Sequence, residues 1–223
     1  MLWDFLFGTI IGWWILIILA AGAFQGVRGL IRAWMRHRRV VAANLARLSD
    51  PRNAESRFTL AKLFSEGKRW SRALALIDEA VTIASDDSRY NNVPHRFFRL
   101  KADCLYGCRD WAGAATAYRK SLEVPSDTGY AEALLGVARS EYRAGRLAEA
   151  VAFGRHAVTE NESLLEAYFR WAQAAAAGKE EAERTKAAED FHRVAAALPP
   201  FARQRRLWWR MAFLFFPIAR RIG

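Results

Sequence analysis

Beyond residue 50 the chain repeats one spacing of small side chains three times, and such a repeat restricts the fold more than any single motif does. Each stretch holds two small residues twelve positions apart and a third one seven positions later. They are Ala61, Ala73 and Ala80, then Ala102, Ala114 and Ser121, and finally Ala138, Ala150 and Ala157. Small residues at helical spacing let neighbouring helices approach closely. Each unit then buries its apolar face only by stacking on the next.

This spacing of small residues resembles the tetratricopeptide repeat, a helix-turn-helix unit of 34 residues. In the best unit, residues 131–158, Gly145 is expected to end the first helix in a left-handed conformation. Gly67 is expected to do the same in the first unit. Large residues begin each second helix and are expected to fill the core, namely Trp70, Trp111 and Leu147.

The resemblance covers residues 54–198 and implies an all-α fold, with an α-solenoid of three clear repeats and a degenerate fourth. In the fourth unit Trp171 matches a first helix. About four extra residues are needed before Ala188 and Ala195 align with the pattern. A lengthened or capping helix pair is therefore expected there, within an array that spans residues 50–200.

The N-terminal segment has no charged residue from Phe5 to Val27. A helix of about 20 apolar residues crosses the hydrocarbon core of a bilayer, so residues 1–27 are predicted to be a transmembrane helix. The arginines follow this segment, and the positive-inside rule then places the repeats in the cytoplasm. The expected localisation is single-pass, in a bacterial cytoplasmic membrane. A periplasmic array is the alternative, because Ala-Gly-Ala at 21–23 resembles a signal cleavage site.

The net charge of +11 would suggest a nucleic-acid partner, but the excess charge lies outside the repeats. Residues 1–48 hold six arginines and one aspartate, and residues 201–223 hold six arginines and no acid. Clustered arginine beside tryptophan is attracted to anionic lipid. We therefore predict a basic amphipathic helix at 28–49, a basic aromatic interfacial helix at 201–223, and no nucleic-acid partner. The expected membrane-contact residues are Trp3, Trp34, Arg36, Arg38, Arg39, Arg206, Trp208, Trp209, Arg210 and Phe215.

No pattern for catalysis or metal binding is found in the sequence. Cys104 and Cys108 lie one helical turn apart, but structural zinc needs four ligands and no second pair exists. Small packing residues are the expected role of both cysteines. No glycine-rich phosphate loop or nucleophile elbow occurs. We therefore predict that the chain is not an enzyme. We also predict that it binds no cofactor, no metal and no small-molecule substrate.

Tetratricopeptide arrays curve so that their first helices line a concave groove, where partner segments bind. The resemblance implies that the partner-binding residues here are Phe58, Lys62, Arg99, Asp103, Tyr106, Arg139, Tyr142, Arg143, Phe169 and Gln173. Arginine and tyrosine supply much of the binding energy in many interfaces, which favours a peptide with some acidic character. Phe58 and Lys62 stand where the carboxylate-clamp members of the family carry Lys and Asn, so that subset is not matched.

The leading hypothesis is a membrane-anchored scaffold or adaptor that binds a protein or peptide in its groove, near the cytoplasmic membrane surface. The alternative is a structural subunit of a bacterial envelope complex, with the transmembrane and C-terminal helices as its main contacts. The plan also resembles the bacterial lipopolysaccharide assembly regulators that act as membrane protease adaptors. Their paired C-x2-C motifs are missing here, so only the architectural part of that resemblance holds.

Overall fold

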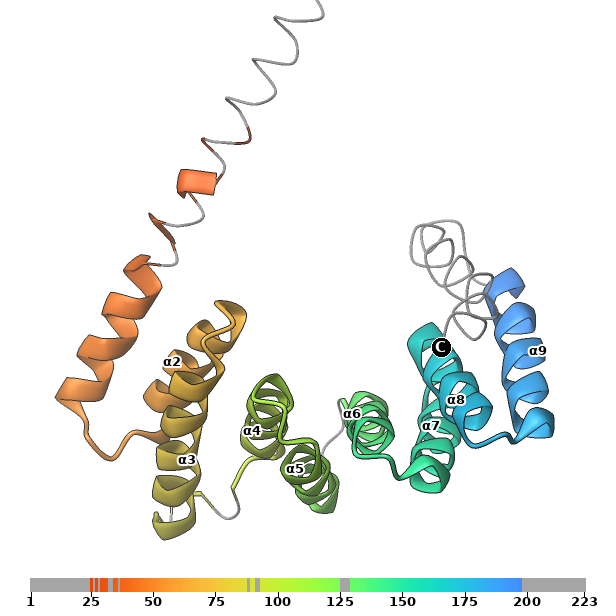
Figure 1. The fold of residues 1–223 in the computed structure, drawn as a ribbon. Helices are drawn as coiled ribbons and strands as arrows, with labels where there is room; N and C mark the ends of the chain where they lie inside the picture. The colour runs from red at the N-terminus through yellow and green to blue at the C-terminus, as the bar shows by residue number, and fades with distance from the viewer. Residues whose placement is uncertain are drawn as a thin grey trace, which may run out of the picture. The chain divides into compact units, whose positions relative to one another are not determined.

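The computed structural model describes residues 25–197 of the chain, except 26, 28, 32, 33, 36, 88, 91, 92 and 125–128. The chain divides into two compact units, residues 1–51 and residues 52–223. In the first unit, residues 37–49 are helical. The second unit holds the helical array (Figure 1).

The predicted transmembrane helix, and with it the single-pass position in a bacterial cytoplasmic membrane, is corrected by the structure. Among the described residues, no helix is both long and apolar enough to cross a membrane. The helix at 37–49 carries three arginines, and each arginine at the centre of a bilayer costs about 3 kcal/mol. Residues 1–24, which hold most of the predicted span, and the predicted interfacial helix at 201–223 lie outside the described residues.

The array consists of helices in antiparallel pairs, and a three-residue connection joins the two helices of each pair. The first helices are α2 (Ala54–Glu66), α4 (His95–Gly107), α6 (Tyr130–Arg143) and α8 (Leu165–Ala177). The second helices are α3 (Trp70–Asp86), α5 (Trp111–Glu123), α7 (Leu147–Glu160) and α9 (Glu181–Ala197). The predicted all-α solenoid of helix-turn-helix units is confirmed.

The repeated small residues form the contact surfaces between these helices. All nine of them are buried, and none is more than 5% exposed. Large side chains fill the space around them, and Phe97, Trp171 and Phe191 are each at most 1% exposed. Because an alanine face lets helix axes approach, the steric interpretation of the pattern is correct.

The large residues that begin the second helices are not core residues. Trp70, Trp111 and Leu147 are half-buried. The Trp70 indole lies so close to Gly107, in the next pair, that a Cβ on this glycine would clash with it. The Trp111 ring meets the ring of Tyr106 edge-on, with 4.8 Å between centroids. The two tryptophans therefore pack at the edge of the array, against the ends of first helices.

The four connections share one backbone conformation. The second residue of each has a positive φ, namely Lys68 (57°), Arg109 (67°), Gly145 (81°) and Lys179 (61°). The amide of the third residue donates to the carbonyl five residues earlier, over 2.8 to 3.0 Å. This hydrogen bond closes the first helix in the manner of a Schellman cap.

The conformation confirms one predicted glycine cap and corrects another. Gly145 is left-handed, as predicted. Gly67 has φ −84°, and its neighbour Lys68 takes the left-handed conformation instead. The predicted extension of the fourth unit is also wrong, because residues 178–180 form a connection of the same length as the others. The fourth unit departs from the pattern in its side chains, and Ala187 rather than Ala188 is fully buried in α9.

First helices of successive pairs contact one another: α2 with α4, α4 with α6, and α6 with α8. Within the described part of the chain, no two second helices make comparable contact. The first helices therefore lie closer together than the second helices do. Their side chains form a continuous surface, which we call the first-helix face.

Candidate functional site

The first-helix face carries all ten of the residues predicted to bind a partner, because each lies on α2, α4, α6 or α8. Lys62, Asp103 and Arg143 are exposed, and the other seven are half-buried. Tyr142 packs against the apolar cluster around Trp171, which places it partly within the core. Tyr106 likewise packs against the apolar cluster around Tyr118. The other eight predicted residues lie at accessible positions outside these two clusters.

The α2 end of this face is aromatic. The ring of Phe58 stacks on that of Phe97, with 4.9 Å between centroids and 10° between planes. The guanidinium of Arg96 lies over both rings, 5.4 Å from the centroid of Phe58 and 5.8 Å from that of Phe97. Arg96 also pairs with Glu55. Arg96 lies on the same helix as the predicted Arg99 but was not itself predicted from the sequence.

The centre of the face is organised around Arg139 on α6. Its guanidinium lies 4.9 Å from the ring centroid of Tyr106 on α4. Its Nη1 atom lies 3.9 Å from Oε1 of Glu166 on α8. The Nε atom is buried and has no hydrogen-bond partner among the described residues. Arg139 therefore joins three successive first helices and keeps one donor unsatisfied.

Asp103 lies beside this centre and receives a hydrogen bond from the Tyr118 hydroxyl on α5. The carboxylate is reachable by solvent, yet its surroundings are largely protein. Burial therefore raises the pKa of Asp103, while the hydrogen bond from Tyr118 and the charges of Arg99 and Arg139 oppose that rise.

The Tyr118 hydroxyl was missed because the sequence places it among core residues. Tyr118 follows Ala114 by four positions and precedes Ser121 by three, so helical spacing puts all three on one buried face. The side chain is 3% exposed, and burial raises the pKa of its hydroxyl. Only its hydroxyl group reaches the first-helix face, and no sequence pattern predicted the hydrogen bond from this hydroxyl to Asp103.

At the α8 end of the face, Arg170 contacts several neighbouring side chains. This residue was not predicted from the sequence. Arg170 donates to Oε1 of Glu166 over 3.2 Å and to the Gln173 amide oxygen over 3.1 Å. Its guanidinium also lies 5.5 Å from the ring centroid of Phe169. Gln173 therefore holds an arginine in place, and its oxygen is already engaged.

The Arg143 side chain is more exposed than that of Arg139, and its guanidinium lies 5.9 Å from the ring centroid of Trp111. Arginines beside aromatic rings offer planar donors and apolar surface together, a combination suited to holding a polypeptide.

Among the described residues no three potential ligands meet in a way that could hold a metal ion. Cys104 is buried, which raises the pKa of its thiol to about 12, and Cys108 is exposed.

Three of the predicted membrane-contact residues lie among the described residues. Trp34 is 58% exposed, and the Arg38 guanidinium lies 5.0 Å from the centroid of its ring. Arg38 and Arg39 are exposed. The remaining seven, Trp3, Arg36, Arg206, Trp208, Trp209, Arg210 and Phe215, lie outside the described residues.

Comparison with known proteins identifies the fold. No protein-family model matches the sequence, and no curated protein matches it. Among solved structures, YrrB, described as a TPR protein with an unusual peptide-binding site, has a TM-score of 0.60 at 12% identity, over 74% of this chain and 80% of its own. PilW, a widely conserved type IV pilus biogenesis factor, has a TM-score of 0.62 at 15% identity, over 76% of this chain and 74% of its own.

MamA from Desulfovibrio magneticus RS-1 is similar in the same way, with a TM-score of 0.60 at 12% identity. The match spans 74% of this chain and 86% of the MamA chain. At such low identities a structural likeness shows the fold alone. The chain therefore has the helical-repeat fold of tetratricopeptide-repeat proteins.

Proposed function

We propose that the array is a scaffold that binds a segment of a partner protein on its first-helix face. The observation that carries this proposal is Arg139, which joins α4, α6 and α8 while its Nε donor stays unsatisfied. The Arg139 side chain is 31% exposed, so a carbonyl or carboxylate of a bound segment can reach the open part of the guanidinium. The peptide-binding site described for YrrB, a protein of the same fold, supports the proposal.

The chemistry of the face favours a segment with some acidic character. Arg99, Arg139 and Arg143 come from two adjacent helices, and the face offers aromatic rings beside them. Fixed donors and rings can hold a main chain and its side chains without forming or breaking covalent bonds. The function is therefore binding, with no catalytic step.

The test is isolation of bound partners with a tagged full-length chain and with Arg139→Glu plus Arg143→Glu. The matched control is Lys120→Glu plus Lys186→Glu, which changes two exposed cations on second helices by the same total charge. The control should retain a partner that the first-helix variant loses. Arg143→Glu alone, at an exposed position, guards against loss through misfolding. Retention of every partner by both first-helix variants would contradict the proposal.

A second proposal concerns the N-terminal unit, where large apolar side chains lie exposed. They are 42% to 73% exposed, and they are Val27, Leu30, Ile31, Trp34, Met35, Val41, Leu45 and Leu48. We propose that these side chains rest on an anionic lipid surface, with Arg38 and Arg39 at the headgroups and no crossing of the bilayer. Cosedimentation with phosphatidylglycerol vesicles should fall for Trp34→Ser plus Leu45→Ser. Equal cosedimentation of the variant and the native chain would contradict this contact.

A further inference from the structure

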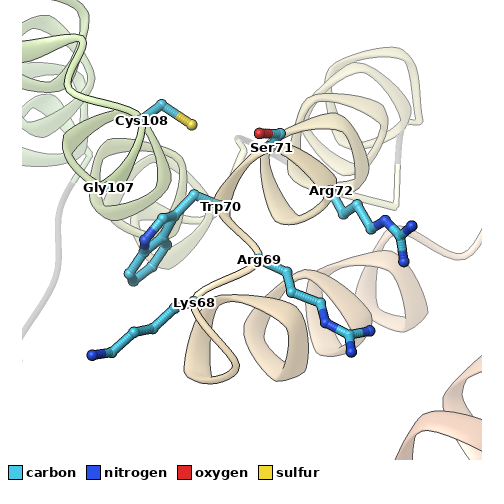
Figure 2. Close-up of a pocket in the computed structure, with 7 residues that line it drawn as sticks. All are labelled: Lys68, Arg69, Trp70, Ser71, Arg72, Gly107 and Cys108. Atoms are coloured by element: carbon cyan, nitrogen blue, oxygen red, sulfur yellow. The ribbon is translucent and has the colours of Figure 1, made fainter.

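A recess with a volume of about 590 Å³ lies beside the connection between α2 and α3, next to the end of α4 (Figure 2). We call it the basic recess. Its walls are Lys68, Arg69, Trp70, Ser71, Arg72, Gly107 and Cys108. Among the described residues, no acidic residue lines it, and none of the ten predicted partner-binding residues does. It is therefore a surface separate from the first-helix face.

The positive charge of the basic recess is not neutralised within the described part of the chain. Lys68, Arg69 and Arg72 are exposed, and none of them pairs with a carboxylate there. The first turn of α3 holds no acidic residue, and the Arg69 side chain makes no capping hydrogen bond to it. Three cations thus meet solvent around one depression. In contrast, Arg96, Arg119 and Arg155 of the array each pair with a glutamate.

The third connection explains why Arg69 has no acid beside it. There, Arg146 occupies the place that Arg69 has in the first connection, and it pairs with the buried carboxylate of Glu141. The residue in the place of Glu141 is Phe64, whose carbonyl accepts from the Arg69 amide just as that of Glu141 accepts from Arg146. The first connection therefore keeps the backbone and the arginine but lacks the acid that would pair with it.

The arrangement of the side chains restricts what the recess can hold. Arg69 and Arg72 extend to one side of the connection, whereas Lys68 extends on the side of the Trp70 indole (Figure 2). The three cations therefore flank the recess from two sides. An extended chain with several acidic side chains can meet Arg69 and Arg72 on one side and Lys68 on the other. The half-buried indole of Trp70, held against Gly107, gives such a chain an apolar surface.

We propose that the basic recess binds an extended acidic segment of a partner protein. The segment contributes carboxylates to Lys68, Arg69 and Arg72, and its aliphatic or main-chain atoms lie against Trp70. Since the cations are exposed, the attraction is screened by salt and acts on the rate of association as well as on affinity. The recess is a second contact, beyond the proposed binding on the first-helix face.

The test measures fluorescence anisotropy of a labelled hexaglutamate peptide with the full-length chain, and hexaglutamine is the uncharged control. Arg69→Glu plus Arg72→Glu should weaken binding by roughly tenfold or more, because two attractions become repulsions. Lys120→Glu plus Lys186→Glu has the same net charge and should bind within about twofold of the native chain. Phe64→Glu, which supplies the missing acid beside Arg69, should also weaken binding although every cation remains.

Equal loss in the recess and control variants would overturn the proposal, because the peptide would then follow net charge alone. Equal binding of hexaglutamine would overturn it too. Inorganic phosphate that displaces the peptide at equal concentration would show a site for a compact anion instead of an extended segment. The same comparison is repeated in an Arg139→Glu plus Arg143→Glu background, where Arg69→Glu plus Arg72→Glu should still weaken hexaglutamate binding by roughly tenfold or more. Failure of the first-helix proposal therefore remains distinguishable from failure of this one.

Discussion

The first and third connections of the array have the same backbone but differ in how their charges are compensated. In both, a left-handed residue precedes an arginine whose amide donates over 2.9 Å to the first helix. In the third, Arg146 pairs with Glu141, whose side chain is fully buried. In the first, Phe64 replaces the acid, and Arg69 pairs with no carboxylate among the described residues. The same three-residue connection therefore stabilises the fold where its arginine pairs with an acid. Where the arginine has no such acid, its charge is available to a binding partner.

The largest expected effect is that of Glu141→Lys. It places a cation in a fully buried position beside Arg119 and Arg146, and an unpaired buried charge typically costs about 4 kcal/mol. Urea denaturation followed by circular dichroism measures the free energy of unfolding. Glu123→Lys, on the exposed end of α5, should change it by less than about 0.5 kcal/mol. An unchanged midpoint for Glu141→Lys would break the comparison, because the paired acid would then add nothing to stability.

The next largest effect concerns the backbone of the third connection, which Gly145→Ala alters without changing any charge. Gly145→Ala meets no atom within 4 Å, so its cost arises from the left-handed conformation alone. We expect a loss of about 1 kcal/mol in the free energy of unfolding, measured by the same urea titration. A neutral outcome would show that the connection relaxes to a negative φ.

Lys68→Gly makes the reverse change in the first connection and should have a smaller effect. Relief of the left-handed strain is partly offset by the greater entropy of glycine in the unfolded chain, which leaves a gain of about 0.5 kcal/mol. The variant also removes one cation from the basic recess. Higher stability together with weaker hexaglutamate binding would show that Lys68 is kept for its charge at an energetic cost. Lower stability would contradict the strain argument.

Asp103 extends the comparison to a carboxylate whose pKa is raised in the folded chain, chiefly by burial. The folded state then binds the proton more tightly than the unfolded state, so stability falls as pH rises from the ordinary aspartate range through the raised pKa. Asp103→Asn should remove this dependence and be slightly more stable than the native chain at pH 7. Thermal melts at pH 4 and pH 7 measure both. A native chain that gains stability from Asp103 ionisation over that window would contradict the assignment.

Much of the fold follows from sterics that are visible in the sequence. The nine small residues were sufficient to define the register, because only a small side chain permits close helix approach, and all nine are buried. The cap at Gly67 was predicted wrongly because glycine is the usual left-handed residue. The hydrogen bond from the Arg69 amide to Phe64 fixes the next position as the left-handed one, and Lys68 accepts the strain.

The candidate site could be predicted only in outline. Helical register placed Arg139 and Tyr106 on the first helices, but their contact depends on the spacing of α4 and α6, which no local pattern encodes. The Tyr118 hydroxyl escaped prediction because its ring belongs to the core. The roles of Arg69 and Glu141 could not be predicted, because equivalent positions hold Phe64 in one unit and a buried acid in another.

Crosslinking in native cells tests the central claim, that a partner binds on the first-helix face, most directly. A photoreactive amino acid replaces Lys62, exposed on that face, in one chain, and Thr116, exposed on α5, in a control chain. Mass spectrometry of the crosslinked products identifies both the partner and its point of contact. We expect one recurring partner peptide, rich in acidic residues, crosslinked at position 62 and absent at position 116. The same partner crosslinked equally at both positions, or at position 116 alone, would contradict it.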